Sequence, residues 1–429
     1  MHNYYIETLG TKKTWPQIDG DVQTDVAIVG AGMTGVATAL ELSERGYKVV
    51  LLDANHVGWG ATGRNGGQVT GSLSGDTAML KQLRKTQGTA AEDFVWNLRW
   101  RGHNIINKRI NRYSIDCDLK TGHLLTAWNE MDIPSFTAMV DEAHRRGMQK
   151  DVSLLSKNEL HERLDTPLYH GAVLNKKNLH LHSLKLCLGE AAAAESLGTV
   201  IYERTLVTDI QTAPAGGVNL KTETGTVHAK YAVLAGNAYH RLMRRKLAGY
   251  LFPAILGNLV TEPLGRELCS KINREDNAVY DSRMVLDYYR LTKEGRLMFG
   301  GGTNYSGKDI NDVAAELRPS LENTFPALKN IGIDYSWTGS AGIVVNRIPM
   351  LGRVNDRIYY AQGYSGHGMA TSHILAEIMA TALSGNLEEL GQFNDFWRWR
   401  IPVPEAAGSA LIALGMKYYL LRERIQRKS

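Results

Sequence analysis

Cysteine is scarce in this chain, because 429 residues contain only Cys117, Cys187 and Cys269. The three lie far apart in the sequence and lack the spacing of metal ligands, and no zinc-binding pattern is present. A disulfide framework is therefore excluded, and we predict no metal ion. Free cysteines are typical of a reducing compartment, so we expect a cytoplasmic protein.

Long apolar runs and a targeting segment are also missing. No apolar run approaches the ~20 residues of a membrane-spanning helix, and the N-terminus Met1-His2-Asn3-Tyr4-Tyr5 lacks the pattern of a signal peptide. The formal net charge is +5 without a long basic block, which argues against nucleic acid as a partner. What remains is a globular chain of ordinary apolar content, long enough for two domains.

Glycine is abundant, and its most informative cluster is Gly30-Ala31-Gly32-Met33-Thr34-Gly35. It follows the apolar run 26–29, and Asp53 ends a second run, 49–52, at the ~20-residue distance typical of a dinucleotide site. The glycines let the backbone approach a pyrophosphate, and the helix that starts near Met33 directs its amides at that charge. Asp53 can accept hydrogen bonds from a ribose. The alternative is a glycine turn in an ordinary βαβ unit.

A second glycine-rich loop follows at residues 58–68, with five glycines in eleven residues. Such a loop can lie close to a flat or phosphorylated ligand, whereas an NAD-binding domain usually continues with a helix and a third strand. Arg64 and Gln68 stand among the glycines and proline is absent, which favours a ligand-facing loop over a flexible solvent loop. The ligand-facing residues expected here are Gly60, Ala61, Thr62, Arg64, Asn65, Gly66, Gly67 and Gln68.

The pattern LLDA…GWGATGRNGGQ resembles the FAD-dependent oxidoreductases of the D-amino-acid oxidase superfamily, and within it the γ-glutamylputrescine oxidoreductase group. The resemblance implies an α/β + β fold: a Rossmann-like FAD-binding domain, with a mostly parallel sheet and helices on both faces, and a mainly antiparallel substrate domain. The FAD-binding domain is expected to be discontinuous, from residues 20–75, 155–240 and 337–405. The substrate domain takes 76–154 and 241–336, and a helical tail takes 406–429.

The local pattern predicts helices over residues 76–112, 132–146 and 183–197. It predicts strands over 205–210 and 284–291. The apolar run 231–234 leads into a small-residue turn at Ala235 and Gly236. By the resemblance, this strand returns to the FAD-binding domain beside the first strand; the alternative is any parallel strand with a short turn.

A further glycine-rich segment precedes the last helix of that domain: Gly363-Tyr364-Ser365-Gly366-His367-Gly368-Met369. Reduction puts negative charge on the flavin pyrimidine, and a helix N-terminus supplies the matching positive potential. By the resemblance, the amides of this segment face the flavin O2/N1 edge; the alternative is an ordinary capped helix. His367 suits proton transfer, or it is only a polar neighbour of the flavin.

The resemblance implies one FAD, bound in an extended form. Some members of the superfamily attach the flavin covalently through a histidine in the early glycine loop or a C-terminal cysteine. This chain has Trp59 and Ala61 in that loop and no cysteine after Cys269, so we expect non-covalent binding. Gly30, Gly32, Met33 and Thr34 are expected at the pyrophosphate, Asp53 at the adenosine ribose, and Val207 at the adenine. The other cofactor-binding residues expected are Ala31, Ala54, Ala235, Gly236, Gly339 and those of the two later glycine-rich segments.

The substrate side of the sequence is less specific. Amino-acid oxidases of the superfamily carry a W-x-G-x-R-P-type run whose arginine binds the substrate carboxylate, and counted from Trp337 that position is Ala341. Without this bidentate partner an amine is favoured over a free α-amino acid, unless Arg347 replaces the missing arginine. Tyr288 and Arg290 share a face of a predicted strand. They bind substrate if this face looks at the flavin and are ordinary surface residues otherwise.

We therefore expect an FAD-dependent amine oxidoreductase. A hydride would pass from the carbon next to nitrogen to flavin N5, the imine would hydrolyse to an aldehyde, and O2 would be reduced to H2O2. By the resemblance, the leading substrate is γ-glutamylputrescine or a similar acylated polyamine. One alternative is a D-amino-acid or secondary-amino-acid dehydrogenase that passes electrons to quinone. The other is a non-catalytic flavin-binding assembly module.

The tail from Ala410 to Arg427 is apolar with a basic end. Leu411, Leu414 and Tyr418 recur at helical spacing, and we expect them to pack against the FAD-binding domain. The competing hypothesis is an amphipathic helix at a membrane surface, which would suit a dehydrogenase that reduces quinone.

Overall fold

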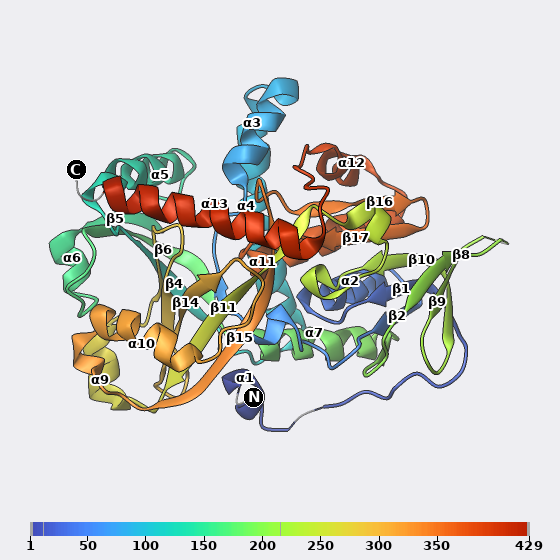
Figure 1. Ribbon diagram of the computed structural model, residues 1–429, viewed down its shortest axis with the longest axis horizontal. Helices are drawn as coiled ribbons and strands as arrows, with labels where there is room; N and C mark the ends of the chain where they lie inside the picture. Colours follow the sequence, from blue (N-terminus) through green and yellow to red (C-terminus); the bar gives the residue numbers. More distant parts are fainter. Residues whose placement is uncertain (1–2, 12, 215, 427–429) are drawn as a thin grey trace.

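Two β-sheets stand side by side in the molecule, and helices pack around them (Figure 1). The computed structural model describes residues 3–11, 13–214 and 216–426. Within this part of the chain, no helix is both long enough and apolar enough to span a bilayer.

The first sheet has eight strands, and its main path runs β16-β17-β10-β1-β2-β7. Neighbours along this path are parallel except β16 with β17, and β8 and β9 extend the sheet as an antiparallel hairpin beside β10. The strands are β1 (Val22–Val29), β2 (Val49–Leu52), β7 (Val200–Tyr202), β8 (Asp209–Thr212), β9 (Val218–Lys221), β10 (Thr226–Leu234), β16 (Met350–Asn355) and β17 (Ile358–Gln362).

Apolar side chains cover both faces of this sheet, as a parallel sheet requires. On one face the main core is formed by α2 (Met33–Glu44), α4 (Ala90–Tyr113), α7 (Ser183–Ser196) and α11 (Gly368–Leu383). A second core on the other face lies under the β8–β9 hairpin and α8 (Arg244–Leu247). The expected Rossmann-like sheet is thus confirmed, and the expected return of the 231–234 run beside the first strand is confirmed by the parallel pairing of β10 with β1.

The second sheet has nine strands in the order β15-β11-β14-β13-β12-β4-β6-β3, with β5 beside β6. All its pairs are antiparallel except β12 with β4. The strands are β3 (Gln68–Val69), β4 (Lys120–Thr126), β5 (Val152–Ser156), β6 (Gly171–His180), β11 (Leu251–Thr261), β12 (Ala278–Asp281), β13 (Tyr288–Leu291), β14 (Leu297–Asn304) and β15 (Ile333–Val344).

The remaining helices surround these sheets. They are α1 (Tyr4–Glu7), α3 (Asp76–Gln87), α5 (Ile133–Arg145), α6 (Lys157–His161), α9 (Gly265–Ile272), α10 (Val313–Thr324), α12 (Glu388–Asp395) and α13 (Glu405–Gln426). Short 3-10 turns are η1 (Ala61–Gly63), η2 (Glu130–Asp132), η3 (Asn237–Tyr239) and η4 (Pro326–Leu328).

Local predictions failed where tertiary contacts or a glycine intervened. The helix predicted over 76–112 is divided into α3 and α4, because Gly88 takes φ +58 and ends α3. The strand predicted over 205–210 begins only at Asp209, since the Thr205 amide donates to the Asp53 carbonyl instead of to a neighbouring strand. The strand predicted over 284–291 begins only at Tyr288.

Three strands lie in the second sheet although all or most of their residues fall within segments assigned to the FAD-binding domain. β3 pairs with β6, β6 also pairs with β4, and β15 pairs with β11. Local sequence patterns do not reveal these pairings. The domain boundaries themselves stay a prediction.

The tail forms the helix α13, but its predicted buried face is wrong. Leu411, Leu414 and Tyr418 are 52%, 66% and 63% exposed. The opposite side of the helix, Ile412, Ala413 and Met416, packs instead on a cluster of Ala254, Tyr305 and Ile343 at the second sheet. Both sides of α13 are apolar, so periodicity alone could not select the packed one. Arg427 lies outside the described residues.

Candidate active site

A cavity of about 860 Å³ lies where the carboxyl ends of β1, β2, β10 and β17 open toward the second sheet. It brings together segments that are far apart in sequence. Of the predicted site residues it is lined by Gly30, Gly32, Met33, Thr34, Asp53, Ala54, Gly60, Ala61, Thr62, Arg64, Asn65, Gly66, Gln68, Val207, Ala235, Gly236, Tyr288, Gly339, Tyr364, Ser365, Gly366, His367, Gly368 and Met369. Ala31, Gly67, Gly363 and Arg290 are not among the lining residues.

Part of the cavity wall is bare backbone because glycines meet there. Gly30 has φ +102, and a Cβ at this position would lie 2.9 Å from the Gly236 Cα. A Cβ on Gly35 would overlap the Gly30 carbonyl oxygen. These glycines let the end of β1, the start of α2 and the turn after β10 touch one another, which is the arrangement that admits a pyrophosphate.

Asp53 follows β2, and its carboxylate is held in place by the chain. Its Oδ2 accepts a hydrogen bond from the Ala31 amide at 2.8 Å, and its Oδ1 accepts one from the Asn55 amide at 2.8 Å. Burial raises the pKa of this carboxyl group, and the two hydrogen bonds oppose the shift. An ionised carboxylate has about four acceptor positions, so Asp53 can still accept hydrogen bonds from ribose hydroxyls. Ala31 thus serves the site through its amide rather than by lining the cavity.

The glycine loop 58–68 is rigidly tied to the rest of the molecule. The Asn65 amide group donates to the carbonyls of Ala61 and Thr62, and the Tyr5 hydroxyl donates to the Asn65 carbonyl at 2.8 Å. The Gln68 side chain donates to the carbonyls of Val279 and Tyr289 in the second sheet. The loop is therefore part of the cavity wall and not a flexible solvent loop.

The C-terminal motif lies against the first one. The hydroxyls of Tyr364 and Thr34 form a hydrogen bond of 2.6 Å, which joins the segment before α11 to the start of α2. His367 stands directly before α11, and its Nδ1 is buried without a hydrogen-bond partner. Burial, and next the nearby Arg347 guanidinium, lower the pKa of His367 to about 4. His367 is therefore neutral near pH 7 and a weaker base than an exposed histidine.

Comparisons with known proteins identify the family. Residues 25–382 match the family model of the FAD dependent oxidoreductases (DAO). A γ-glutamylputrescine oxidoreductase from Escherichia coli (strain K12) is 36% identical over 425 residues, which are 99% of this chain and 98% of that protein. This chain belongs to the FAD-dependent oxidoreductase family.

Solved structures share the fold of this oxidoreductase. Glycine oxidase from Geobacillus kaustophilus superposes with a TM-score of 0.70 at 20% identity, over 86% of this chain and 98% of that one. L-amino acid deaminase from Proteus vulgaris superposes with a TM-score of 0.71 at 18% identity, over 91% of this chain and 99% of that one. The predicted cofactor FAD and the predicted two-sheet flavoenzyme fold are thereby confirmed.

The residues of the oxidoreductase fit FAD. The glycine turn at the end of β1, the buried Asp53 carboxylate and the unpartnered Nδ1 of His367 all lie in or at one cavity. Val207 also lines it, although from an extended segment before β8 rather than from within a strand.

Tyr288 and Arg290 separate in the folded chain. The Tyr288 ring covers the glycine loop, because a Cβ on Gly66 would lie 2.5 Å from it, and its hydroxyl donates to the Asn258 side chain at 3.0 Å. Arg290 is 3% exposed and donates through Nε to the Gly66 carbonyl at 2.8 Å. Arg290 thus holds the glycine loop and is not among the residues that line the cavity, and its catalytic role stays a prediction.

The wall facing the C-terminal motif contains Ala341 and Arg347 together with residues that the sequence did not indicate. Arg347 takes φ +63, which turns the backbone at the end of the Trp337 run. Sequence reasoning missed residues both in the turn after β10 and in the second sheet with its connections, and each stands outside a recognisable motif. Those of the second sheet and its connections are Leu256, Asn258, Tyr280, Met284, Leu286, Thr303 and Tyr305.

Proposed function

We propose that this enzyme oxidises the amine of an acylated polyamine such as γ-glutamylputrescine and uses O2 as electron acceptor. The observation that carries the proposal is Ala341, which lines the cavity. By the resemblance, it stands at the position of the Trp337 run at which amino-acid oxidases carry an arginine. Support comes from the relative that is 36% identical over nearly its whole length and is named γ-glutamylputrescine oxidoreductase. A cavity wall without a bidentate guanidinium at this position suits an amine carbon that carries no carboxylate.

His367 is proposed to contact the substrate amine. When bound, FAD would supply the two-electron acceptor for the carbon–nitrogen bond of the substrate. The amine must be neutral to give up electrons, and the neutral imidazole of His367, whose Nδ1 has no hydrogen-bond partner, can accept a hydrogen bond from it and orient it. The Tyr288 ring covers the glycine loop and also lines the cavity.

One observation favours the second candidate, oxidation of a D-amino acid or secondary amino acid with electrons passing to quinone. Arg347 lines the cavity close enough to His367 to lower the pKa of its imidazole, and its Nη1 lies 3.4 Å from the Ser365 carbonyl oxygen. A guanidinium beside His367 can bind a carboxylate. A third alternative, a non-catalytic flavin-binding module, has no such support in a chain of an oxidoreductase family.

A substrate panel distinguishes these candidates. Purified holoenzyme is mixed anaerobically with γ-glutamylputrescine, putrescine, D-alanine, L-proline and sarcosine, and flavin bleaching is followed by absorbance. Bleaching by γ-glutamylputrescine, with peroxide formed on admission of air, supports the proposal. Bleaching by D-alanine or L-proline without bleaching by any amine contradicts it, and turnover that needs a quinone contradicts the proposed acceptor.

A further inference from the structure

Helix α13 presents an apolar stripe to solvent. Ile412, Ala413 and Met416 face the second sheet, so Leu411, Leu414 and Tyr418 occur at the opposite side of the same helix. The outward residues are between 52% and 66% exposed. An exposed row of large apolar side chains on an ordered helix costs stability in water and marks a contact surface.

Two exposed tryptophans precede α13 in the sequence. Trp397 and Trp399 are 54% and 55% exposed, and their rings meet edge to face at 4.5 Å between centroids. The backbone that carries them is held firmly: the Trp397 carbonyl accepts from Gln82 and Asn346, and its amide donates to Gln82. These bonds hold the Trp397 backbone in place at α3 and the turn after β15.

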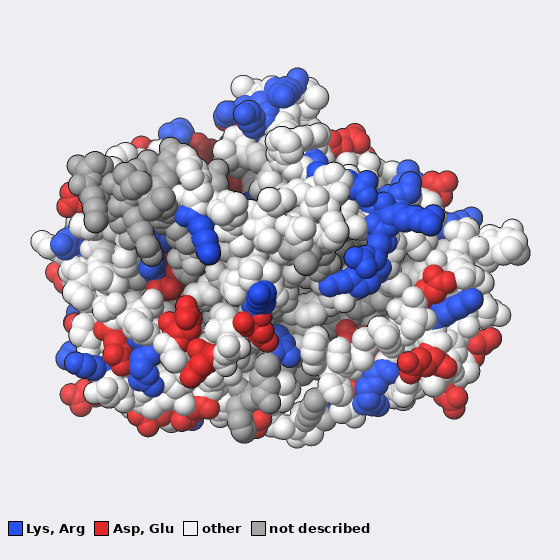
Figure 2. Space-filling view, viewed as in Figure 1, with Lys and Arg blue, Asp and Glu red and all other residues white. Residues whose placement is uncertain are grey.

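Basic side chains stand around these apolar ones. Arg400 donates to the carbonyls of Arg245 and Ala248, which brings the tryptophan segment beside α8. Exposed cations there and on the neighbouring elements are Lys81 and Lys85 of α3, Arg244, Arg245 and Lys246 of α8, Arg400, and Lys417 of α13. Figure 2 shows Lys and Arg gathered beside the start of α13 and on the tip of α3, with uncharged surface between them.

We propose that this surface, consisting of Trp397, Trp399, Leu411, Leu414, Tyr418 and the basic residues just named, binds the face of an anionic lipid bilayer. Tryptophan, tyrosine and leucine insert at the boundary of headgroups and acyl chains, while arginine and lysine attract anionic headgroups. A second copy of the chain fits this surface less well than a bilayer does. In a symmetric dimer contact, the basic residues of one copy would face the same basic residues of the other.

The surface adjoins the cavity through α13. The inward side of α13 packs on the cluster that contains Tyr305 and Ile343, and both of these residues also line the cavity. Binding by this surface would therefore hold the cavity wall next to the bilayer. The inference concerns where the enzyme works and does not depend on the identity of its substrate.

Co-sedimentation of the full-length holoenzyme with vesicles tests the proposal. We expect sedimentation with phosphatidylcholine vesicles that contain phosphatidylglycerol at low salt, and release from them at high salt or with phosphatidylcholine alone. Leu411→Ser with Leu414→Ser, and separately Arg244→Glu with Arg245→Glu, should each lower the partition coefficient by about tenfold or more. Leu197→Ser is the matched control, since Leu197 is 41% exposed beyond the end of α7.

Three results would overturn the proposal. They are no sedimentation of the wild type with phosphatidylglycerol vesicles, equal sedimentation of wild type and both variants, or a loss with Leu197→Ser as large as with the variants. Light scattering tests the competing occupant. A dimer that becomes a monomer in the leucine variant, without vesicle binding by the wild type, assigns the surface to a second copy.

Discussion

Asp53 links the first glycine motif to the cofactor through one carboxylate. Because it is buried and already oriented by two backbone amides, it can receive a ribose hydroxyl without reorganisation. We expect Asp53→Ala to weaken FAD binding by about 1–3 kcal/mol, the range for a hydrogen bond to a charged group. Flavin titration of the apoenzyme measures this. Asp25→Ala is the control, because Asp25 lies on β1 of the same sheet, outside the cavity, and pairs with Lys230; an equal loss there would contradict the role of Asp53.

Ala341 is the residue on which substrate choice is proposed to depend. Ala341→Arg should create a carboxylate partner inside the cavity and improve the Kd of an amino acid by about 10–100-fold, which corresponds to about 1.5–3 kcal/mol. Anaerobic bleaching with D-alanine and with γ-glutamylputrescine, before and after substitution, measures the change. Val345→Arg is the control, because Val345 ends the same run outside the cavity and is 38% exposed. An unchanged preference in Ala341→Arg would contradict the assignment of this position.

At the scale of elements, one buried carboxylate joins the helices that cover the first sheet. Glu190 of α7 accepts from Arg109 of α4 at 3.1 Å and lies 3.0 Å from the His373 imidazole of α11, while Arg109 also donates to Glu41 of α2 at 2.8 Å. Although burial opposes ionisation, His373 and Arg109 lower the pKa of Glu190 to about 2. Four helices thus share one buried ionic network.

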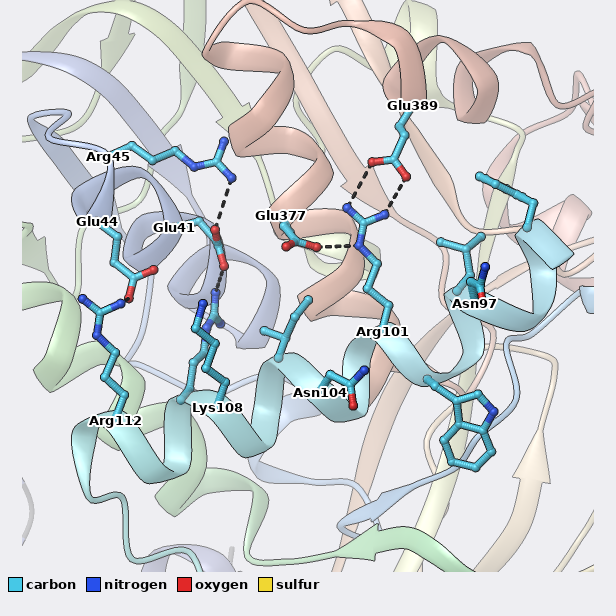
Figure 3. Close-up of a pocket in the computed structure, with 15 residues that line it drawn as sticks. Glu41, Glu44, Arg45, Asn97, Arg101, Asn104, Lys108, Arg112, Glu377 and Glu389 are labelled. Carbon is cyan, nitrogen blue, oxygen red and sulfur yellow. Dashed lines mark hydrogen bonds and ion pairs between the residues drawn. The ribbon is translucent and has the colours of Figure 1, made fainter. Parts of the chain in front are cut away.

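Removing this carboxylate should be costly. Glu190→Ala leaves Arg109 buried with fewer partners, so we expect a loss of about 3–5 kcal/mol in the free energy of unfolding. Figure 3 shows a comparable ion pair in the charged groove along α4, between Arg101 and Glu377. Both partners are partly exposed there, so Glu377→Ala should cost about 0–1 kcal/mol. Urea denaturation of the two variants measures the difference, and similar losses would contradict the buried network.

The tail shows how an element can be predicted while its orientation is not. The spacing of Leu411, Leu414 and Tyr418 correctly indicated a helix, yet this side is exposed. Ile412, Ala413 and Met416 form an equally apolar side of the helix. This side packs on the cluster of Ala254, Tyr305 and Ile343. Which side is buried was decided by the partner surface, and the local sequence does not contain that surface.

At the scale of the whole molecule, four buried histidines make stability depend on pH. Burial lowers the pKa of His103 to about 4, of His123 and His182 to about 3, and of His180 to about 2. In the unfolded chain a histidine has a pKa of about 6.5. Below that pH the unfolded state binds more protons than the folded state, so their contribution to stability is complete above about pH 6.5 and is lost as the pH falls.

We therefore expect the free energy of unfolding to fall between pH 7 and pH 5, by up to about 1.4 kcal/mol per histidine and pH unit below the unfolded pKa. Urea denaturation at several pH values measures the slope. His180→Asn should flatten it, because Asn does not titrate, whereas the more exposed His228→Asn should leave it unchanged. A free energy of unfolding that is constant from pH 7 to pH 5 would contradict the prediction.

Much of the cofactor site could be predicted from local sequence. A strand, a glycine turn and a helix start lie within a few residues of one another, so Gly30 and Asp53 could be assigned from their spacing, and the 363–369 segment from the family resemblance. The substrate side depends on the tertiary structure. Tyr305, Asn258 and Arg347 line one cavity because distant strands pair. Arg290 donates a hydrogen bond to the Gly66 carbonyl of the glycine loop. Helix α13 buries the side that packs on the cluster of Ala254, Tyr305 and Ile343. These outcomes depend on contacts between distant segments, which local periodicity and spacing do not encode.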